Sequence, residues 1–334
     1  MTKQTGALAS KPGGSRKKRG GFYNIKTQKI VVGITFMIIP LILLFVFTYL
    51  PFGKMAQFSL YEMRYIGTRT FVGLGNYKDV FTRPELFNSL KLSLYYLLAS
   101  VVQLGLALYF ATILSFKLRG GNFFKGVMFF PYLVSGIAIG FIFKFFFTRG
   151  FVLDSLLVFL GANQESLPYW LRDSSVNNLM LAATSVWRYM GQNMVLFIGA
   201  IMSVDPSLYE AAEIDGANSW HKFKSIIMPS IKTIVVLNLI LSITGSISAF
   251  EPPYVITNGT FGTGTYFFMM NQMAHEKQKV GLAAAMAVVL MLIIILVTVF
   301  QKVVFRIFFE EDKNGYTFSE RRAKKKRERG GTTA

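Results

Sequence analysis

The chain has 334 residues, of which 52% are hydrophobic and 16% are charged, and its net charge is +19. Long apolar blocks with few charges are typical of a protein that lies in a bilayer, which excludes an ordinary soluble domain. The excess of Lys and Arg lies largely in the two tails, where it orients membrane helices and contacts anionic lipid, so nucleic-acid binding is not expected.

The order of polar and apolar stretches predicts three parts. Residues 1–29 are polar and basic and should form a cytoplasmic tail of disorder-like composition. Residues 30–309 should form a transmembrane domain, and residues 310–334 a second basic cytoplasmic tail. The first apolar block is too long for a cleaved signal peptide and should remain as a signal anchor. Six apolar segments predict an all-α polytopic membrane protein with about six transmembrane helices, at residues 30–50, 90–116, 123–147, 176–204, 233–250 and 280–305.

The distribution of positive charge predicts that both termini are cytoplasmic. Lys and Arg are concentrated in the tails and in the connections at residues 117–125 and 222–232, and positively charged connections stay on the cytoplasmic side. The alternate connections, at residues 51–89, 148–175 and 251–279, should therefore lie outside. Their turn-forming residues indicate compact loops, which either form a docking face for a partner or simply join helices.

The cytoplasmic connection at residues 205–229 is polar, yet its sequence predicts structure. Asp205 is a good N-cap, and Pro206 suits the first position of a short helix. Gly216 can end that helix with a positive φ, and Asn218 can cap a second helix. The pattern therefore predicts two short helices joined by a turn, which we call the elbow.

The composition of the elbow favours either docking of a partner or a capped amphipathic connector on the membrane surface. Two acidic residues of the elbow, Glu210 and Asp215, could bind basic or hydroxyl groups of a partner. Small residues would let its backbone approach closely: Ala211, Ala212, Gly216 and Ala217. The apolar residues should pack the elbow onto itself or onto the membrane helices: Leu208, Ile214, Trp220, Phe223 and Ile227. Pro229 is expected to begin the fifth span.

One stretch of the elbow resembles the EAA loop of permease subunits of binding-protein-dependent ABC importers. It reads Glu210-Ala211-Ala212-Glu213-Ile214-Asp215-Gly216-Ala217, followed by Phe223, Ile226 and Pro229, with Met228 in place of the usual Leu. Two further stretches resemble carbohydrate permeases: Phe71-Val72-Gly73-Leu74-Gly75-Asn76-Tyr77 and Tyr254-Val255-Ile256-Thr257-Asn258-Gly259. In that family the EAA loop is a coupling helix that sits in a groove of the cytoplasmic ATPase.

The resemblance covers roughly residues 30–309 and implies a type I ABC importer permease, similar to the first permease of maltose and glycerol-phosphate importers. It implies ATP-driven translocation of a sugar or oligosaccharide across the bacterial cell membrane. The implied partners are a second permease in a heterodimer, two ATPase subunits and an extracytoplasmic solute-binding protein. ATP and Mg would be bound by the ATPase subunits, with no cofactor on this chain. The implied coupling residues are Glu210, Ala211, Ala212, Asp215, Gly216 and Ala217.

Sequence motifs for catalysis are missing, so we expect a non-catalytic subunit. The sequence contains no G-x-x-x-x-G-K-[ST], no H-E-x-x-H and no G-x-S-x-G. Its two histidines, His221 and His275, are far apart along the chain, and no metal-ligand cluster is expected. ATP hydrolysis would therefore take place on another chain.

Polar residues within the predicted spans are candidates for a substrate pathway, because polarity that faces lipid is costly. On the fourth span these are Arg188, Gln192 and Asn193, and on the fifth span Asn238, Ser242 and Ser246, which recur every four residues. They would hydrogen-bond sugar hydroxyls, with Trp187 and Phe250 as stacking faces. The alternative is helix packing through small polar residues. Glu251 is read as a solvated helix end, although it resembles an acidic position of the family.

Other transport classes remain open at this stage. An ion-gradient-driven secondary transporter would also have several spans, but such proteins often carry acidic residues within them. The predicted spans here hold almost no Asp or Glu. An ABC permease for a solute other than a sugar is the second alternative.

Overall fold

The computed structural model describes residues 25–116 and 118–309, and the chain divides into two compact units, residues 1–54 and 55–334. The predicted tails fall mostly outside the described residues. Residues 25–29 are the exception, because they form the start of a helix rather than part of a tail.

The described residues of the first unit, from residue 25 onward, form one continuous helix with a local widening. It comprises α1 (Ile25–Leu44), the π-helical turn η1 (Phe45–Tyr49) and the start of α2 (Leu50–Phe58). The predicted first span ends at Leu50, whereas the helix continues to Phe58. The physical reason is that η1 comes directly before Pro51, and a π-turn redistributes the carbonyls that a proline leaves unpaired.

The described residues of the second unit form helices, connecting loops and one short antiparallel pair of strands. Strands β1 (Tyr61–Glu62) and β2 (Thr70–Phe71) pair with Tyr61 opposite Phe71. The α-helices are α3 (Gly75–Thr82), α4 (Pro84–Leu114), α5 (Gly121–Leu133), α6 (Gly136–Phe147), α7 (Val152–Phe159), α8 (Asn177–Met202), α9 (Pro206–Ile214), α10 (Ser219–Lys222), α11 (Met228–Ile247), α12 (Tyr266–His275) and α13 (Val280–Phe309). Three shorter turns are η2 (Gln164–Ser166), η3 (Phe223–Ile227) and η4 (Pro253–Thr257).

The number of spans agrees with the prediction once two bends are taken into account. Four helices of the described residues are long and apolar enough to cross a membrane, and six spans result if each bent pair counts as one. Helices α5 and α6 meet at 98°, and α8 and α9 meet at 74°. The single segment predicted at residues 123–147 is therefore two helices that meet at a bend. Pro131 lies near the end of α5 and Val134 is extended, which stops the helix before α6 begins.

The fifth span begins earlier than predicted. Residues from Ser219 to Ile247 form one long helix in which α10, η3 and α11 follow each other without a break. Pro229 lies in the first turn of α11 rather than at the start of the span, and η3 precedes it as η1 precedes Pro51. Helix α4 likewise begins at Pro84, ahead of the predicted apolar block, because Arg83 is extended and Pro84 occupies the first helical position.

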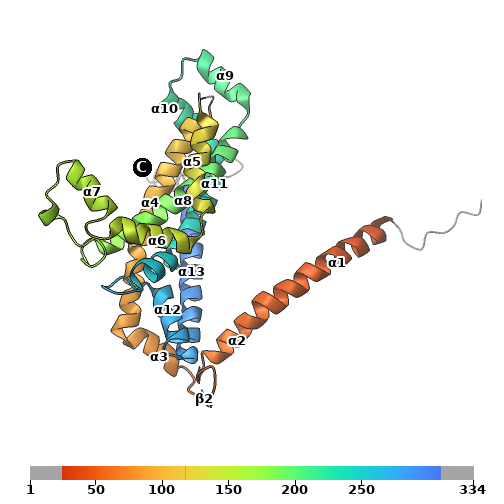
Figure 1. Ribbon diagram of the computed structural model, residues 1–334. Coiled ribbons are helices and arrows are strands. Elements are labelled where there is room, and N and C mark those ends of the chain that lie inside the picture. Colours follow the sequence, from red (N-terminus) through yellow and green to blue (C-terminus); the bar gives the residue numbers. More distant parts are fainter. Residues whose placement is uncertain (1–24, 117, 310–334) are drawn as a thin grey trace, which may run out of the picture. The chain divides into compact units, whose positions relative to one another are not determined.

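The centre of the second unit is a bundle of α4, α8 and α11, with α5 packed on α8 and α13 packed on α11. One apolar cluster joins α4, α8 and the region around α11 through buried side chains such as Ala107, Phe197 and Ile231. Figure 1 shows α9 and α10 at one end of the bundle and α3 at the opposite end. The elbow and the connection that follows the first helix are thus separated by the length of the membrane helices.

Candidate functional site

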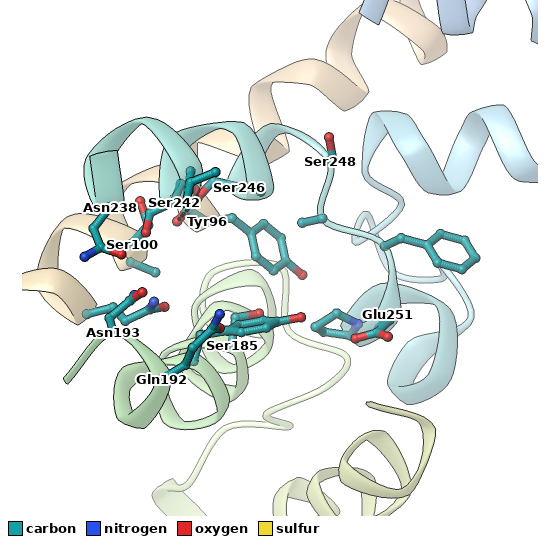
Figure 2. A pocket seen from close by; sticks show the side chains of 18 of the residues that line it. Tyr96, Ser100, Ser185, Gln192, Asn193, Asn238, Ser242, Ser246, Ser248 and Glu251 are labelled. Atoms are coloured by element: carbon teal, nitrogen blue, oxygen red, sulfur yellow. Dashed lines mark hydrogen bonds between the residues drawn. The ribbon is translucent and has the colours of Figure 1, made fainter. Parts of the chain in front are cut away.

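A cavity of about 410 Å³ lies between α4, α8 and α11 (Figure 2). Hydroxyl and carboxamide side chains from all three helices line it, beside a few apolar groups. Its polar lining consists of Tyr96, Ser100, Gln103, Ser185, Tyr189, Gln192, Asn193, Asn238, Ser242, Ser246, Ser248 and Glu251. Among the described residues that line the cavity, Glu251 alone carries a formal charge.

Five of the six predicted pathway residues line this cavity. Gln192 and Asn193 reach it from α8, and the stripe of Asn238, Ser242 and Ser246 reaches it from α11. In Figure 2 the stripe faces Asn193 and Gln192 across the open space. The four-residue recurrence on α11 therefore corresponds to one face of the helix, as expected.

The carboxamides of the cavity have unused hydrogen-bonding capacity. Within the described part of the chain, the side chains of Gln103, Gln192, Asn193 and Asn238 form no hydrogen bond to protein. The hydroxyl of Ser246, by contrast, donates to the carbonyl oxygens of Tyr96, at 3.1 Å, and Ser242, at 2.7 Å. Amides that both donate and accept, held at the wall of a cavity, are suited to a ligand with many hydroxyl groups.

Helix α4 contributes to the site, which the sequence analysis missed. Its buried polar residues are spaced by four and three positions in turn and form one stripe: Ser89, Ser93, Tyr96, Ser100 and Gln103. The last three line the cavity. The signal was present in the sequence, because polar residues with this spacing occupy one face of a helix. A stripe of serines is a weaker indication of a polar path than an arginine within a span, because serine is common where membrane helices pack together.

One predicted pathway residue, Arg188, and one predicted stacking residue, Trp187, are placed differently by the structure. Arg188 does not line the cavity but forms an ion pair with Glu251, behind the wall. Trp187 is also absent from the lining, and its ring packs edge-on against Phe143 with centroids 5.2 Å apart. Phe250 does line the cavity, with its ring stacked on Tyr254 at 4.8 Å. Of the two expected stacking residues, Phe250 therefore lines the cavity and Trp187 does not.

The elbow has the predicted caps. The side chain of Asp205 accepts a hydrogen bond from the backbone N–H of Ser207 at 3.0 Å, and this bond lowers the pKa of the Asp205 carboxyl. At the other end of α9, Gly216 adopts a φ of 73°. The N–H of Ala217 donates to the carbonyl of Ala212, and that of Gly216 to Glu213. These two bonds form a Schellman motif, which satisfies the last carbonyls of the helix.

The two arms of the elbow are tied together and to the bundle by a few contacts. Lys222 of α10 forms an ion pair with Glu213 of α9 at 2.7 Å. The ring of Tyr209 packs edge-on against Phe116 at 5.6 Å. Asn218 caps α10 by accepting from the N–H of His221. The elbow is thus a defined structure rather than a loose loop.

The apolar residues of the elbow divide into two groups, and our expectation was only partly correct. Phe223 and Ile227 pack into the apolar cluster of the bundle. Ile214 is 88% exposed, Trp220 is 65% exposed and Leu208 is 48% exposed. Leu208 and Ile214 remain outside because α9 is only nine residues long and turns away from α8. The ring of Trp220 in α10, although exposed, stacks on Phe223 with centroids 5.6 Å apart, so it packs within the elbow as expected.

The predicted coupling residues lie on this same exposed part of the chain. Glu210, Ala211, Asp215 and Gly216 are exposed, and Ala212 and Ala217 are half-buried. A Cβ added to Gly216 would meet no atom within 4 Å. Among the described residues, no group of His, Asp and Glu side chains is arranged to hold a metal ion.

A polar cavity inside a bundle of apolar helices, with a structured elbow at one end, defines a multi-pass membrane transport protein. The chain belongs to the family described as the binding-protein-dependent transport system inner membrane component, whose model matches residues 103–308. It is therefore a permease subunit in the cell membrane.

Individual relatives support the same family. The chain is 32% identical to the probable ABC transporter permease protein YesP of Bacillus subtilis, over 72% of this chain and 79% of YesP. It is 29% identical to the lactose transport system permease protein LacF of Rhizobium radiobacter, over 72% of this chain and 80% of LacF. It is 32% identical to the arabinooligosaccharides transport system permease protein AraP of B. subtilis, over 64% of this chain and 69% of AraP.

The fold is also that of a solved transporter. A chain of a bacterial ABC transporter involved in the import of the acidic polysaccharide alginate matches with a TM-score of 0.74 at 15% identity, covering 85% of this chain and 98% of that chain. A second structure, in complex with an alginate pentasaccharide-bound periplasmic protein, matches with a TM-score of 0.69 at 16% identity, over 84% and 96% of the two chains. The type I permease architecture expected from the sequence is confirmed.

Proposed function

We propose that the chain is a transmembrane permease subunit of an ATP-driven importer, and that it translocates a sugar or oligosaccharide delivered by an extracytoplasmic binding protein. Family membership supports the importer class, and the relatives named for lactose and arabinooligosaccharides support the cargo. The observation that carries the proposal is the cavity itself, whose lining of free carboxamides and hydroxyls matches the hydroxyl groups of a sugar.

The cavity is the proposed translocation path. It is lined from three helices, so a relative movement of α4, α8 and α11 changes its width at either end. Its carboxamides can exchange hydrogen bonds with successive hydroxyls of a passing sugar, and the small side chains between them leave room for sugar rings. Many weak, equivalent hydrogen bonds suit transport, because the solute must be released as well as bound.

The elbow is the proposed contact with an ATPase subunit. Its exposed apolar residues, Leu208, Ile214 and Trp220, would enter a groove of that subunit, beside the small residues around Ala211 and Gly216. Closure of two ATPase subunits would draw the elbows of two permeases together and open the cavity outward. Hydrolysis of the ATP, bound with Mg on those subunits, would reset it. Such coupling requires that the two ATPase states contact the elbow differently.

The ion-gradient alternative is less well supported. Family membership indicates a transport system that depends on a binding protein, and the cavity lining lacks the paired acidic groups on which proton-coupled or sodium-coupled carriers often depend.

Two measurements test the proposal. Purification through a tag on this chain should recover a second permease, an ATPase and a solute-binding protein, and sugar uptake by the reconstituted complex should be abolished by vanadate. Recovery of the chain alone, with uptake that resists vanadate and follows a proton or sodium gradient, would overturn it.

A further inference from the structure

We propose that the hydroxyl of Tyr96 and the carboxylate of Glu251 together bind a pair of hydroxyls on the transported sugar, and that the cavity selects an uncharged sugar. This inference rests on the proposed function and adds to it the binding groups at one end of the cavity and the charge class of the cargo. Neither residue was among those predicted to line the path.

Tyr96 has a buried hydroxyl with no partner. The residue is 3% exposed, and its oxygen forms no hydrogen bond within the described part of the chain. It lines the cavity, and in Figure 2 its ring extends from α4 toward the end at which Glu251 lies. Buried polar atoms are nearly always satisfied in folded proteins, so an unpaired hydroxyl at a cavity wall points to a ligand there.

Glu251 brings a carboxylate to the same cavity and is fixed by a partner behind it. Arg188 of α8 forms the ion pair with Glu251, and its own side chain is only 16% exposed, against 42% for Glu251. The Arg188 guanidinium also lies over the ring of Tyr189, 5.0 Å from its centroid. The basic group is therefore held inside the wall, and the acidic group is the one presented to the cavity.

The surroundings of the ion pair leave it little freedom. A small cavity of about 20 Å³ beside it is lined by Gly136, Arg188 and Glu251, among others. A Cβ added to Gly136 would overlap the side chains of both Glu251 and Arg188, so the first turn of α6 lies directly against the pair. Arg188 thus acts as a positioning residue: its ion pair holds the Glu251 carboxylate in one orientation.

The chemistry of the two groups complements a sugar. An ionised carboxylate only accepts hydrogen bonds and can accept from two neighbouring hydroxyls, whereas a phenol can donate as well as accept. Neighbouring sugar hydroxyls donate to Glu251 while one of their oxygens accepts from Tyr96. Hydrogen bonds to an ionised group are stronger than those between neutral groups, so Glu251 should orient the sugar.

The same carboxylate determines which sugars are excluded. No Lys or Arg is among the described residues that line the cavity, so a uronate would bring a second negative charge close to Glu251 without a free cation to balance it. Like charges repel, and the repulsion is stronger where water is partly excluded. The inferred cargo therefore differs in charge from the acidic polysaccharide of the structurally similar alginate transporter.

The hydroxyl of Tyr96 is tested by a change that removes only one oxygen. In the complete transporter with its binding protein, a panel of neutral α-glucan, arabinan and galactoside trisaccharides identifies the sugar imported. Tyr96→Phe should raise the concentration for half-maximal uptake of that sugar roughly three- to tenfold. The matched control is Tyr95→Phe on the same helix, because Tyr95 is 39% exposed and does not line the cavity. It should leave uptake unchanged.

The charge of Glu251 is tested by competition. The purified complex in nanodiscs, without the binding protein, is given the radiolabelled neutral sugar together with trigalacturonate. Trigalacturonate should not compete in the wild type and should begin to compete in Glu251→Gln, while binding of the neutral sugar weakens. Glu251→Gln alone leaves Arg188 buried and unpaired. The double variant Arg188→Gln with Glu251→Gln removes both charges and repeats the test without that effect.

The outcomes separate this inference from the proposed function. Wild-type import of a neutral sugar, combined with unchanged uptake in Tyr96→Phe or with competition by trigalacturonate in the wild type, overturns the inference and leaves the importer in place. Failure of the wild-type complex to import any sugar of the panel, or import of uronates alone, overturns the proposed cargo and the inference together.

Discussion

Two residues fix the shape of the elbow, and each acts through the backbone beside it. Asp205 accepts the hydrogen bond that begins α9, and Gly216 provides the positive φ that ends it. Both roles were predicted from the sequence because caps and positive-φ turns depend on residues a few positions apart. Arg188 and Trp187 show the opposite case. Their partners lie 63 and 44 positions away along the chain, so local pattern could not indicate where their side chains point.

At the residue scale, we predict that Gly216→Val uncouples the transporter. Valine at a φ of 73° is strained by about 1–2 kcal/mol, so the elbow should lose its turn, and ATP hydrolysis should no longer respond to the loaded binding protein. The measurement is stimulated ATPase activity of the reconstituted complex, with membrane insertion checked separately.

A second substitution at this position distinguishes strain from crowding. Asn tolerates the left-handed conformation, and the structure leaves open space around Gly216 within the chain. If strain is the cause, Gly216→Asn should keep most of the stimulation. Loss in both variants would indicate that the partner approaches this position closely, and full stimulation in Gly216→Val would contradict a coupling role for the turn.

The cap at Asp205 gives the second prediction at this scale. Asp205→Ala should destabilise the first turn of α9 by about 1 kcal/mol, because the N–H of Ser207 loses its acceptor, whereas Asp205→Asn should preserve it. Hydrogen exchange of the amides at residues 207–209 measures this directly. Equal protection in the Ala variant and the wild type would show that the elbow is held by its other contacts.

At the scale of helices, two of the prolines within spans, Pro51 and Pro229, are each preceded by a π-turn, whereas Pro40 lies inside α1 without one. Turn η1 comes before Pro51 and η3 before Pro229, and in both places the helix continues past the proline. Sequence reasoning placed helix boundaries there, since proline usually starts or ends a helix. It also joined α5 and α6 into one span, because an apolar block gives no sign of a 98° bend. The positions of the apolar blocks along the chain were predicted correctly.

The stripe on α11 gives the prediction at this scale. Ser242→Leu should narrow the cavity and remove a hydroxyl, and we expect the maximal rate of sugar uptake to fall at least tenfold while assembly stays normal. Thr233→Leu is the control on the same helix, because Thr233 is exposed and does not line the cavity. Normal uptake in Ser242→Leu would remove α11 from the path.

At the scale of the whole molecule, the account joins a polar cavity in the membrane to an elbow at one end of the bundle (Figure 1). The six-span architecture followed from composition and from the spacing of apolar blocks. The cavity did not, because it exists only where α4, α8 and α11 meet, and residues such as Tyr96 and Glu251 acquire their position from that packing. Transport requires that these two parts move together, so the contact made by the elbow is the central claim.

The most direct test uses the absence of cysteine from the natural sequence. Ala211→Cys places a single thiol on the exposed face of α9, and Ile66→Cys places one on the connection at the opposite end of the bundle, where Ile66 is 91% exposed. With a short thiol-reactive cross-linker, Ala211→Cys should join the chain to a co-purifying ATPase subunit, with a yield that changes when vanadate is added. Ile66→Cys should give no such product. Absence of any ATPase adduct from Ala211→Cys in an assembled, transport-active complex would contradict the account.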